Sequence, residues 1–209
     1  MKLKIEVETK SRLYIGGIPQ GYSLGGIDMI TATQEGKPYI PASSFKGALR
    51  EICRDYKCTD IEDIYPKDKY PDVKEPLNDS IFIPRHLFVF GIPGVNRSPK
   101  LAFSDLILAP KHTDPALFFS LESKNTITES DDGKIAANPR TYKAAASELT
   151  FIGHAWLRGF TEKQQGEEKL LYSYIKNMAE KFNDGEYRLG NSKSRGYGHI
   201  QVQIDKAEG

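Results

Sequence analysis

The stretch Leu189-Gly-Asn-Ser-Lys-Ser-Arg-Gly-Tyr-Gly198 runs directly into His199-Ile-Gln-Val-Gln-Ile204 near the C-terminus. Apolar residues alternate in the second part, which predicts a β-strand. The first part is rich in glycine, so its backbone can approach a phosphate closely, and Lys193 and Arg195 supply positive charge. Tyr197 offers a ring on which a base can stack. Taken alone, the stretch fits a flexible turn as well as it fits a phosphate-binding loop.

The composition is that of an ordinary globular protein, with 39% hydrophobic and 27% charged residues in a chain of 209. This length suits one domain with insertions. The net charge is +1, so a nucleic-acid-binding face would have to concentrate the cations on one side. No apolar run reaches the roughly 18 residues of a membrane-spanning helix. Charge comes too early for a signal peptide, and we expect a cytoplasmic protein without membrane contact.

Two cysteines, Cys53 and Cys58, stand close together in the sequence. A zinc site needs four ligands, and no second cluster of Cys or His lies at motif spacing. We therefore expect reduced thiols, with Cys53 on the apolar face of a helix.

Hydrophobic periodicity places the secondary structure along the chain. We expect strands at 2–9, 82–90, 101–108, 117–121, 148–158 and 199–204, and helices at 43–56 and 167–182. Without insertions, the order is βαββαβ, an α+β arrangement of the ferredoxin-like kind that also underlies the RNA recognition motif. About 57–100 forms a lid-like insertion in this single domain. About 122–147 forms a protruding hairpin whose tip holds Asp131-Asp-Gly133.

The first predicted helix has a second face of interest. Lys46, Arg50 and Arg54 recur at i, i+4 and i+8, which aligns three cations. Pro41 precedes the helix, and Ser43 or Ser44 is able to cap it. The N-terminus of the helix could also bind an anion through its backbone N–H groups. The alternative is a solvated face of mixed sign, because Glu51 and Asp55 lie close by.

Three blocks of the chain resemble a known family. They are Gly25-Gly-Ile-Asp28, Tyr39-Ile-Pro-Ala-Ser-Ser-Phe-Lys-Gly-Ala-Leu-Arg50 and Ser192-Lys-Ser-Arg-Gly-Tyr-Gly198. In this order they resemble the repeat-associated mysterious protein (RAMP) superfamily of CRISPR systems, and particularly the repeated backbone subunit of type III effector complexes of the III-A form. The resemblance extends over nearly the whole chain.

The resemblance implies a subunit that lines up with copies of itself, and with other effector subunits, along a CRISPR RNA. Each copy would hold about six nucleotides of guide, and its thumb, roughly 122–146, would displace one base pair of the duplex between the guide and a single-stranded target RNA. It implies that guide contacts come from Ser43, Ser44, Lys46, Arg50, Arg54, Lys193, Ser194, Arg195 and Tyr197. It also implies a thumb that carries Asn125, Ile127 and Arg140.

The resemblance further implies that Asp28 cuts the target RNA with Mg²⁺ or another divalent cation. A loop carboxylate can hold such an ion against a phosphate oxygen, while the displaced nucleotide leaves a 2′-hydroxyl free to attack. From the residues alone, the alternative is that Asp28 is a loop aspartate that accepts hydrogen bonds from nearby amides, which is common beside glycine. Tyr14 stands where close relatives often have a histidine, which puts the rate of cleavage in doubt.

Two other functions remain open. The chain could be a non-catalytic backbone or capping subunit of the same kind of complex. It could also be a nuclease that processes CRISPR precursors, but such enzymes usually work through a histidine general base. No histidine falls in the early glycine-rich segment, which disfavours the processing nuclease.

Overall fold

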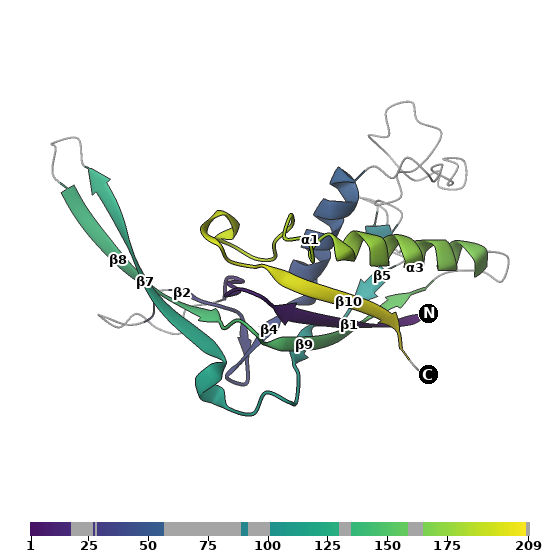
Figure 1. Ribbon diagram of the computed structural model, residues 1–209, viewed down its shortest axis with the longest axis horizontal. Helices are drawn as coiled ribbons and strands as arrows, with labels where there is room; N and C mark the ends of the chain where they lie inside the picture. Colours follow the sequence, from purple (N-terminus) through teal and green to yellow (C-terminus); the bar gives the residue numbers. More distant parts are fainter. Residues whose placement is uncertain are drawn as a thin grey trace.

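The computed structural model describes residues 1–17, 27, 29–56, 89–91, 101–129, 135–158 and 165–207. Figure 1 shows a sheet with helices on one side and a long two-stranded hairpin that projects away from it. The core strands are β1 (Lys2–Thr9), β9 (Thr150–Leu157) and β10 (Ile200–Lys206), and the helices are α1 (Ala42–Asp55) and α3 (Gln165–Glu180). The predicted α+β class is confirmed.

The main sheet has the order β10-β1-β9-β6-β4-β3, and β5 also pairs with β9. Here β3 is Thr33–Gln34, β4 is Lys37–Ile40, β5 is Leu101–Phe103 and β6 is Leu106–Leu108. The strand β1 lies between β9 and β10 and is antiparallel to both. With β5 and β6 counted as one interrupted strand, this is the 4-1-3-2 order of a ferredoxin-like sheet, which explains the predicted βαββαβ order.

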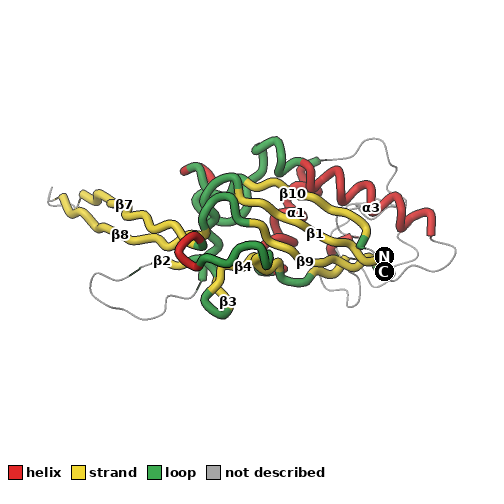
Figure 2. Tube along the Cα trace, turned by 60° about the horizontal axis from the view of Figure 1, so that its bottom comes forward, coloured by secondary structure: helices red, strands yellow, loops and turns green. Residues whose placement is uncertain are grey.

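The alternation seen in the sequence decides which face of the sheet is buried. Leu3, Ile5 and Val7 of β1 are fully buried, whereas the alternating residues Lys2 and Lys4 are exposed. The helices cover the buried face, and Figure 2 shows both of them on the same side of the strands. In α1, the predicted apolar positions Phe45, Leu49, Ile52 and Cys53 are all buried. Burial of such an amphipathic stripe is the main stabilisation of a helix of this length.

The start of α1 differs from the prediction that Ser43 or Ser44 caps it. The residue before the helix is Pro41, whose side chain has no group that can accept a hydrogen bond and therefore cannot cap the helix. Instead, the carboxylate of Asp105, from the turn between β5 and β6, accepts a hydrogen bond of 2.7 Å from the backbone N–H of Ala42. The serines therefore lie inside the first turn. A capping group 63 residues away in the chain is not readable from local sequence.

Two predicted strands need correction. Val89 and Phe90 are helical, so the expected strand at 82–90 is wrong at its described end, and 82–88 lie outside the described residues. The expected strand at 117–121 begins instead with a 3₁₀ turn at Pro115–Leu117, whose first turn is capped by the Asp114 carboxylate. Most of the expected lid-like insertion, 57–88 and 92–100, also lies outside the described residues.

The predicted thumb hairpin is present as β7 (Phe119–Glu129) and β8 (Ile135–Ala145), at the left of Figure 1. The two strands pair antiparallel from Phe119↔Ala145 to Glu129↔Ile135. A short strand, β2 (Met29–Ile30), adds to β8 in parallel at the root of the hairpin. The expected tip at 131–133 lies outside the described residues.

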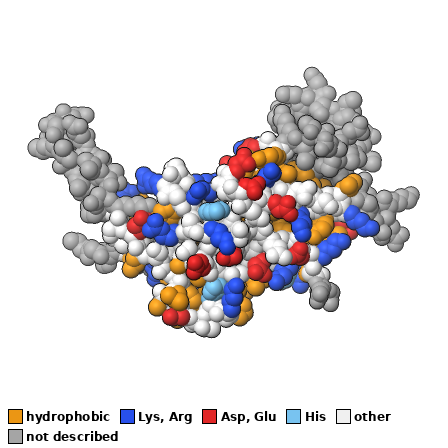
Figure 3. All heavy atoms as spheres, viewed as in Figure 1, with side chains coloured by type: hydrophobic (Ala, Val, Ile, Leu, Met, Phe, Trp, Pro, Cys, Tyr) orange, Lys and Arg blue, Asp and Glu red, His pale blue; other side chains and the backbone are white. Residues whose placement is uncertain are grey.

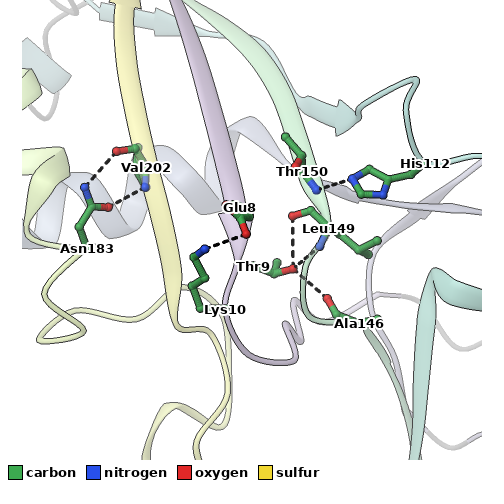
Figure 4. Close-up of polar contacts among 9 residues, drawn as sticks. All are labelled: Glu8, Thr9, Lys10, His112, Ala146, Leu149, Thr150, Asn183 and Val202. Carbon is green, nitrogen blue, oxygen red and sulfur yellow. Dashed lines mark hydrogen bonds and ion pairs between the residues drawn. The ribbon is translucent and has the colours of Figure 1, made fainter.

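Side chains finish the sheet where backbone pairing ends (Figure 4). The Asn183 amide accepts from the backbone N–H of Val202 at 2.7 Å and donates to its carbonyl at 3.2 Å. This pairing covers part of the outer edge of β10, which would otherwise offer free groups to another chain. Across the described residues, no helix is both long enough and apolar enough to cross a membrane.

His112 supplies a pH-sensitive contact at β9. Its Nε2 accepts a hydrogen bond of 2.9 Å from the backbone N–H of Thr150 (Figure 4). Burial, and then the nearby charge of Lys111, lower the pKa of His112 below its ordinary value of 6.5. The bond needs a neutral imidazole, because a protonated ring has no acceptor nitrogen.

We expect the free energy of unfolding to fall as the pH drops through about 6.5, because the unfolded chain then binds the proton more readily than the folded chain. Replacing His112 by Ala should lower stability near pH 7.5 by about 1 kcal/mol and should flatten this pH dependence. Urea unfolding at several pH values measures both effects. Equal slopes in the two proteins would contradict the assignment.

Candidate nucleic-acid interface

An open groove of about 420 Å³ lies between the first half of α1 and the glycine-rich loop at 189–198. Three segments that are distant in the sequence meet there: the chain after β1, the start of α1 and the glycine-rich loop. Its described lining residues are Ile15, Gly16, Ser43, Ser44, Gly47, Ala48, Glu51, Gly190, Asn191 and Lys193. Most of these side chains are small, so backbone groups and hydroxyls form much of the wall.

The glycine-rich loop is shaped by residues with positive φ. A 3₁₀ turn at Lys193–Arg195 is flanked by Ser192 with φ +59° and Gly196 with φ +86°. At Gly190, φ is +82°, and an added Cβ would overlap the carbonyl oxygen of Tyr14. That close approach allows the backbone N–H of Asn191 to donate to the same carbonyl at 2.8 Å. The loop therefore adopts a defined conformation in the groove wall, held to the segment after β1 by backbone hydrogen bonds.

The charges in the groove are few and already paired. Lys193 Nζ lies 3.4 Å from Glu51 Oε2, and both side chains are more than 40% exposed. An exposed pair of this kind contributes roughly 0–1 kcal/mol, so Lys193 can exchange Glu51 for another anion at little cost. In Figure 3, cationic and acidic side chains are interspersed over the visible face, as the net charge of +1 suggests.

The predicted cationic stripe does not line this groove. Successive helix residues are about 100° apart, which puts Arg50 about 20° and Lys46 about 60° from Ser43, on the side away from Gly47 and Glu51. The two cations therefore flank the groove beside Ser43 and do not line it. Arg54 is exposed, and its Nε lies 3.4 Å from Asp55 Oδ1. Of the residues expected to contact RNA, the groove thus brings together Ser43, Ser44 and Lys193. The others, Lys46, Arg50, Arg54, Ser194 and Arg195, are not among its described lining residues.

Tyr197 is a clear correction, because its ring is 1% exposed and cannot stack on a base in this structure. It packs in a small cluster with Tyr14 and Ala144. The fold of the loop explains the inward direction. The N–H of Leu189 donates to the carbonyl of Gly198, which joins the two ends of the loop. The N–H of Gly198 donates to the carbonyl of Arg12, which joins the loop to the segment after β1.

Asp28 lies outside the described residues, and so do the side chains of the predicted thumb residues Asn125 and Ile127; Arg140 is exposed on β8. The chain on either side of Asp28 is described. Ile27 is 38% exposed, and Met29 pairs with Tyr142 at the root of the thumb. Within the described part of the chain, no three His, Cys, Asp or Glu residues could hold a metal ion. The expected divalent cation stays a prediction.

Tyr14 is the residue at whose position the resemblance implies a histidine in many relatives. Burial, and then the neighbouring Tyr142, raise the pKa of its phenol above 10.0. Its hydroxyl donates to the sulfur of Met29 at 3.4 Å, and its ring meets that of Tyr142 edge-on at 5.6 Å. The neutral phenol therefore packs between β2 and β8.

The sequence profile of the RAMP superfamily matches residues 6–201. The chain belongs to the RAMP superfamily. No curated protein matches it at a significant level.

Two solved structures show the fold of this RAMP protein. One is a chain of the Type III-B Cmr-beta complex bound to cognate target RNA, with 18% identity and a TM-score of 0.55. The match covers 99% of this chain but only 61% of the Cmr-beta chain. The other is a chain of a Type IV-B CRISPR complex, with 16% identity and the same TM-score, and it covers 100% of this chain and 93% of the other.

Several groove residues were not selected from the sequence. Gly47 stands four residues after Ser43 and four before Glu51. Helical spacing could therefore have shown that these three residues share a face of the helix on which Gly47 leaves space. Gly16 and Ile15 gave no comparable signal, because their place beside α1 depends on tertiary contacts with Thr31 and Asn191.

We expect Gly190→Ala to destabilise the protein more than Gly196→Ala. Both residues have positive φ, which costs an alanine about 1–2 kcal/mol, but only at Gly190 would the methyl group also meet backbone. At Gly196 nothing lies within 4 Å of the added Cβ. Urea midpoints of the two variants measure the difference, and equal midpoints would contradict the close approach.

Proposed function

We propose that this protein is a CRISPR-RNA-binding subunit of an effector complex. The observation that carries the proposal is the groove at 43–51 and 190–193, where small side chains and an ordered glycine-rich loop give an extended anion access to backbone. Membership of the RAMP superfamily and the likeness to chains of two CRISPR complexes support it.

In this proposal the RNA backbone lies in the groove and is held mainly by neutral donors. The hydroxyls of Ser43 and Ser44 donate to phosphate oxygens, and Gly47 leaves room for the strand to approach α1. Lys193 releases Glu51 and binds a phosphate instead. Contacts of this kind recognise the backbone rather than the bases, which suits a subunit that must accept guides of any sequence.

In finer detail, we propose a backbone subunit of a type III, III-A-like complex, which forms a filament with copies of itself and other subunits in the cytoplasm. It would cut complementary RNA at intervals of about six nucleotides, with Asp28 as the catalytic residue. A divalent cation bound there would neutralise charge on the scissile phosphate. The chain's own contribution is β2, which begins at Met29, the residue after Asp28 in the sequence, and pairs with β8 at the root of the thumb.

The alternative is a non-catalytic structural or capping subunit of the same kind of complex. In this alternative Asp28 takes no part in any chemistry, and replacement of Asp28 separates the two functions.

Changes at the ion pair in the groove should act in opposite directions. Lys193→Ala should weaken binding of single-stranded RNA and reduce the slope of log K against log salt by about 0.7, the value for one phosphate contact. Glu51→Gln should strengthen binding several-fold, because it removes a carboxylate from the path and frees Lys193. Fluorescence anisotropy at several salt concentrations measures both.

The pair Lys46→Ala with Arg50→Ala provides the comparison for the cations that flank the groove beside Ser43. If the guide follows the groove, this double variant should change the salt slope less than Lys193→Ala does. A larger change would place the RNA along the cationic stripe instead.

In the assembled complex, Asp28→Ala should abolish target cleavage while target binding changes by less than about 1 kcal/mol, since the duplex is held mainly through its phosphates. Mapping of the cut sites, with and without Mg²⁺, and a parallel binding assay make the measurement. Unchanged cleavage would reject the catalytic role and favour the structural subunit.

A further inference from the structure

Three side chains from three separate segments meet between the glycine-rich loop and the root of the thumb. Glu122 lies near the start of β7, opposite Tyr142 of β8. Its Oε2 accepts a hydrogen bond from the Tyr197 hydroxyl. Its other oxygen, Oε1, lies 3.1 Å from Arg12 Nη1. The Arg12 guanidinium in turn lies over the Tyr197 ring, 5.0 Å from its centroid. Each of the three therefore contacts both of the others.

The contacts of this triad are partly shielded from water. The Tyr197 side chain is almost fully buried, and Glu122 is 28% exposed. Hydrogen bonds to a charged group are stronger than neutral ones, and shielding limits their screening by solvent. The adjacent ring contact between Tyr14 and Tyr142 belongs to the same cluster. The triad is thus a built contact and not a chance pairing of surface charges.

The triad connects two parts of the protein to which different tasks are proposed. Tyr197 follows Lys193 of the groove after one 3₁₀ turn, in the same loop. Glu122 stands in β7 opposite Tyr142, which pairs with Met29 next to the Asp28 position. A displacement of the loop would therefore reach the root of the thumb through one turn of chain and one side-chain contact.

We propose that Glu122 is a positioning residue that fixes the thumb to the glycine-rich loop through Tyr197 and Arg12. RNA bound in the groove then orders the root of the thumb, and the thumb keeps a set direction relative to the bound guide. This inference rests on the proposed function, because it takes RNA as the ligand of the groove.

Hydrogen exchange of the full-length protein tests it, with an oligouridylate of about twelve nucleotides as the RNA, since backbone contacts tolerate any sequence. In the wild type, RNA should slow exchange both in the groove, at 190–195, and at the root of the thumb, at 119–123 and 141–145. In Tyr197→Phe, which keeps the buried ring, the groove should still respond while the slowing at the thumb root falls about fivefold to tenfold. Glu122→Ala should lose the same response.

Tyr56→Phe is the matched control, because the Tyr56 hydroxyl also donates to a carboxylate, that of Glu186 at 2.5 Å, but at the far end of α1. It should leave the response of the thumb root unchanged. A thumb root that responds equally in Tyr197→Phe and the wild type would overturn the inference. So would a wild-type thumb root that does not respond while the groove does, and that result would leave the proposed function standing. A wild type in which RNA slows exchange in neither region would overturn the proposed function, and this inference with it.

Discussion

The close backbone contact between the glycine-rich loop and the segment after β1 is the constraint on which the rest of this structure depends. Gly190 and Gly198 both have positive φ. A Cβ at Gly190 would overlap the carbonyl of Tyr14, and a Cβ at Gly198 would overlap the carbonyl of Leu189 at the start of the loop. Only because these side chains are absent can Asn191 and Gly198 donate to the carbonyls of Tyr14 and Arg12. The contact holds the loop against the segment after β1, and residues of both line the groove together with the start of α1.

The same contact explains why the glycine-rich loop does not offer Tyr197 as a surface on which a base can stack, although its composition suggests this. Closing the loop against Arg12 and Tyr14 turns the Tyr197 ring inward, where the Glu122 carboxylate accepts its hydroxyl hydrogen bond. Burial of an aromatic ring contributes about 1.5–3 kcal/mol, and its hydroxyl is satisfied there, so the inward position is the stable one. The part of the loop left to face the groove is Gly190 to Lys193, which is mostly backbone.

Periodic elements were predictable from the sequence, whereas contacts between them were not. The alternation in β1 and β10 and the apolar stripes of α1 and α3 reflect burial against one common core, and each can be read from a single segment. The cap of α1 could not be found this way, because Asp105 reaches it from another strand connection. Helical spacing also revealed that Lys46 and Arg50 share a face, but not which neighbour that face meets. Of the residues predicted to contact RNA, the described groove lining includes Ser43, Ser44 and Lys193, whereas the stripe lies outside it and Tyr197 is buried. Contact with RNA stays a prediction.

The anchoring of the thumb follows from the weakness of isolated hairpins. A two-stranded ribbon is marginally stable in water, so β7 and β8 need support from the body of the protein. That support is concentrated at the root, where β2 adds to β8, Leu13 bridges to Ala145, and Lys143 lies over the Phe119 ring at 4.2 Å. A small change of angle at the root is multiplied along the length of the ribbon. Residues at the root therefore constrain the position of the thumb more strongly than residues along its strands. Among them, Glu122 also accepts a hydrogen bond from Tyr197 of the glycine-rich loop.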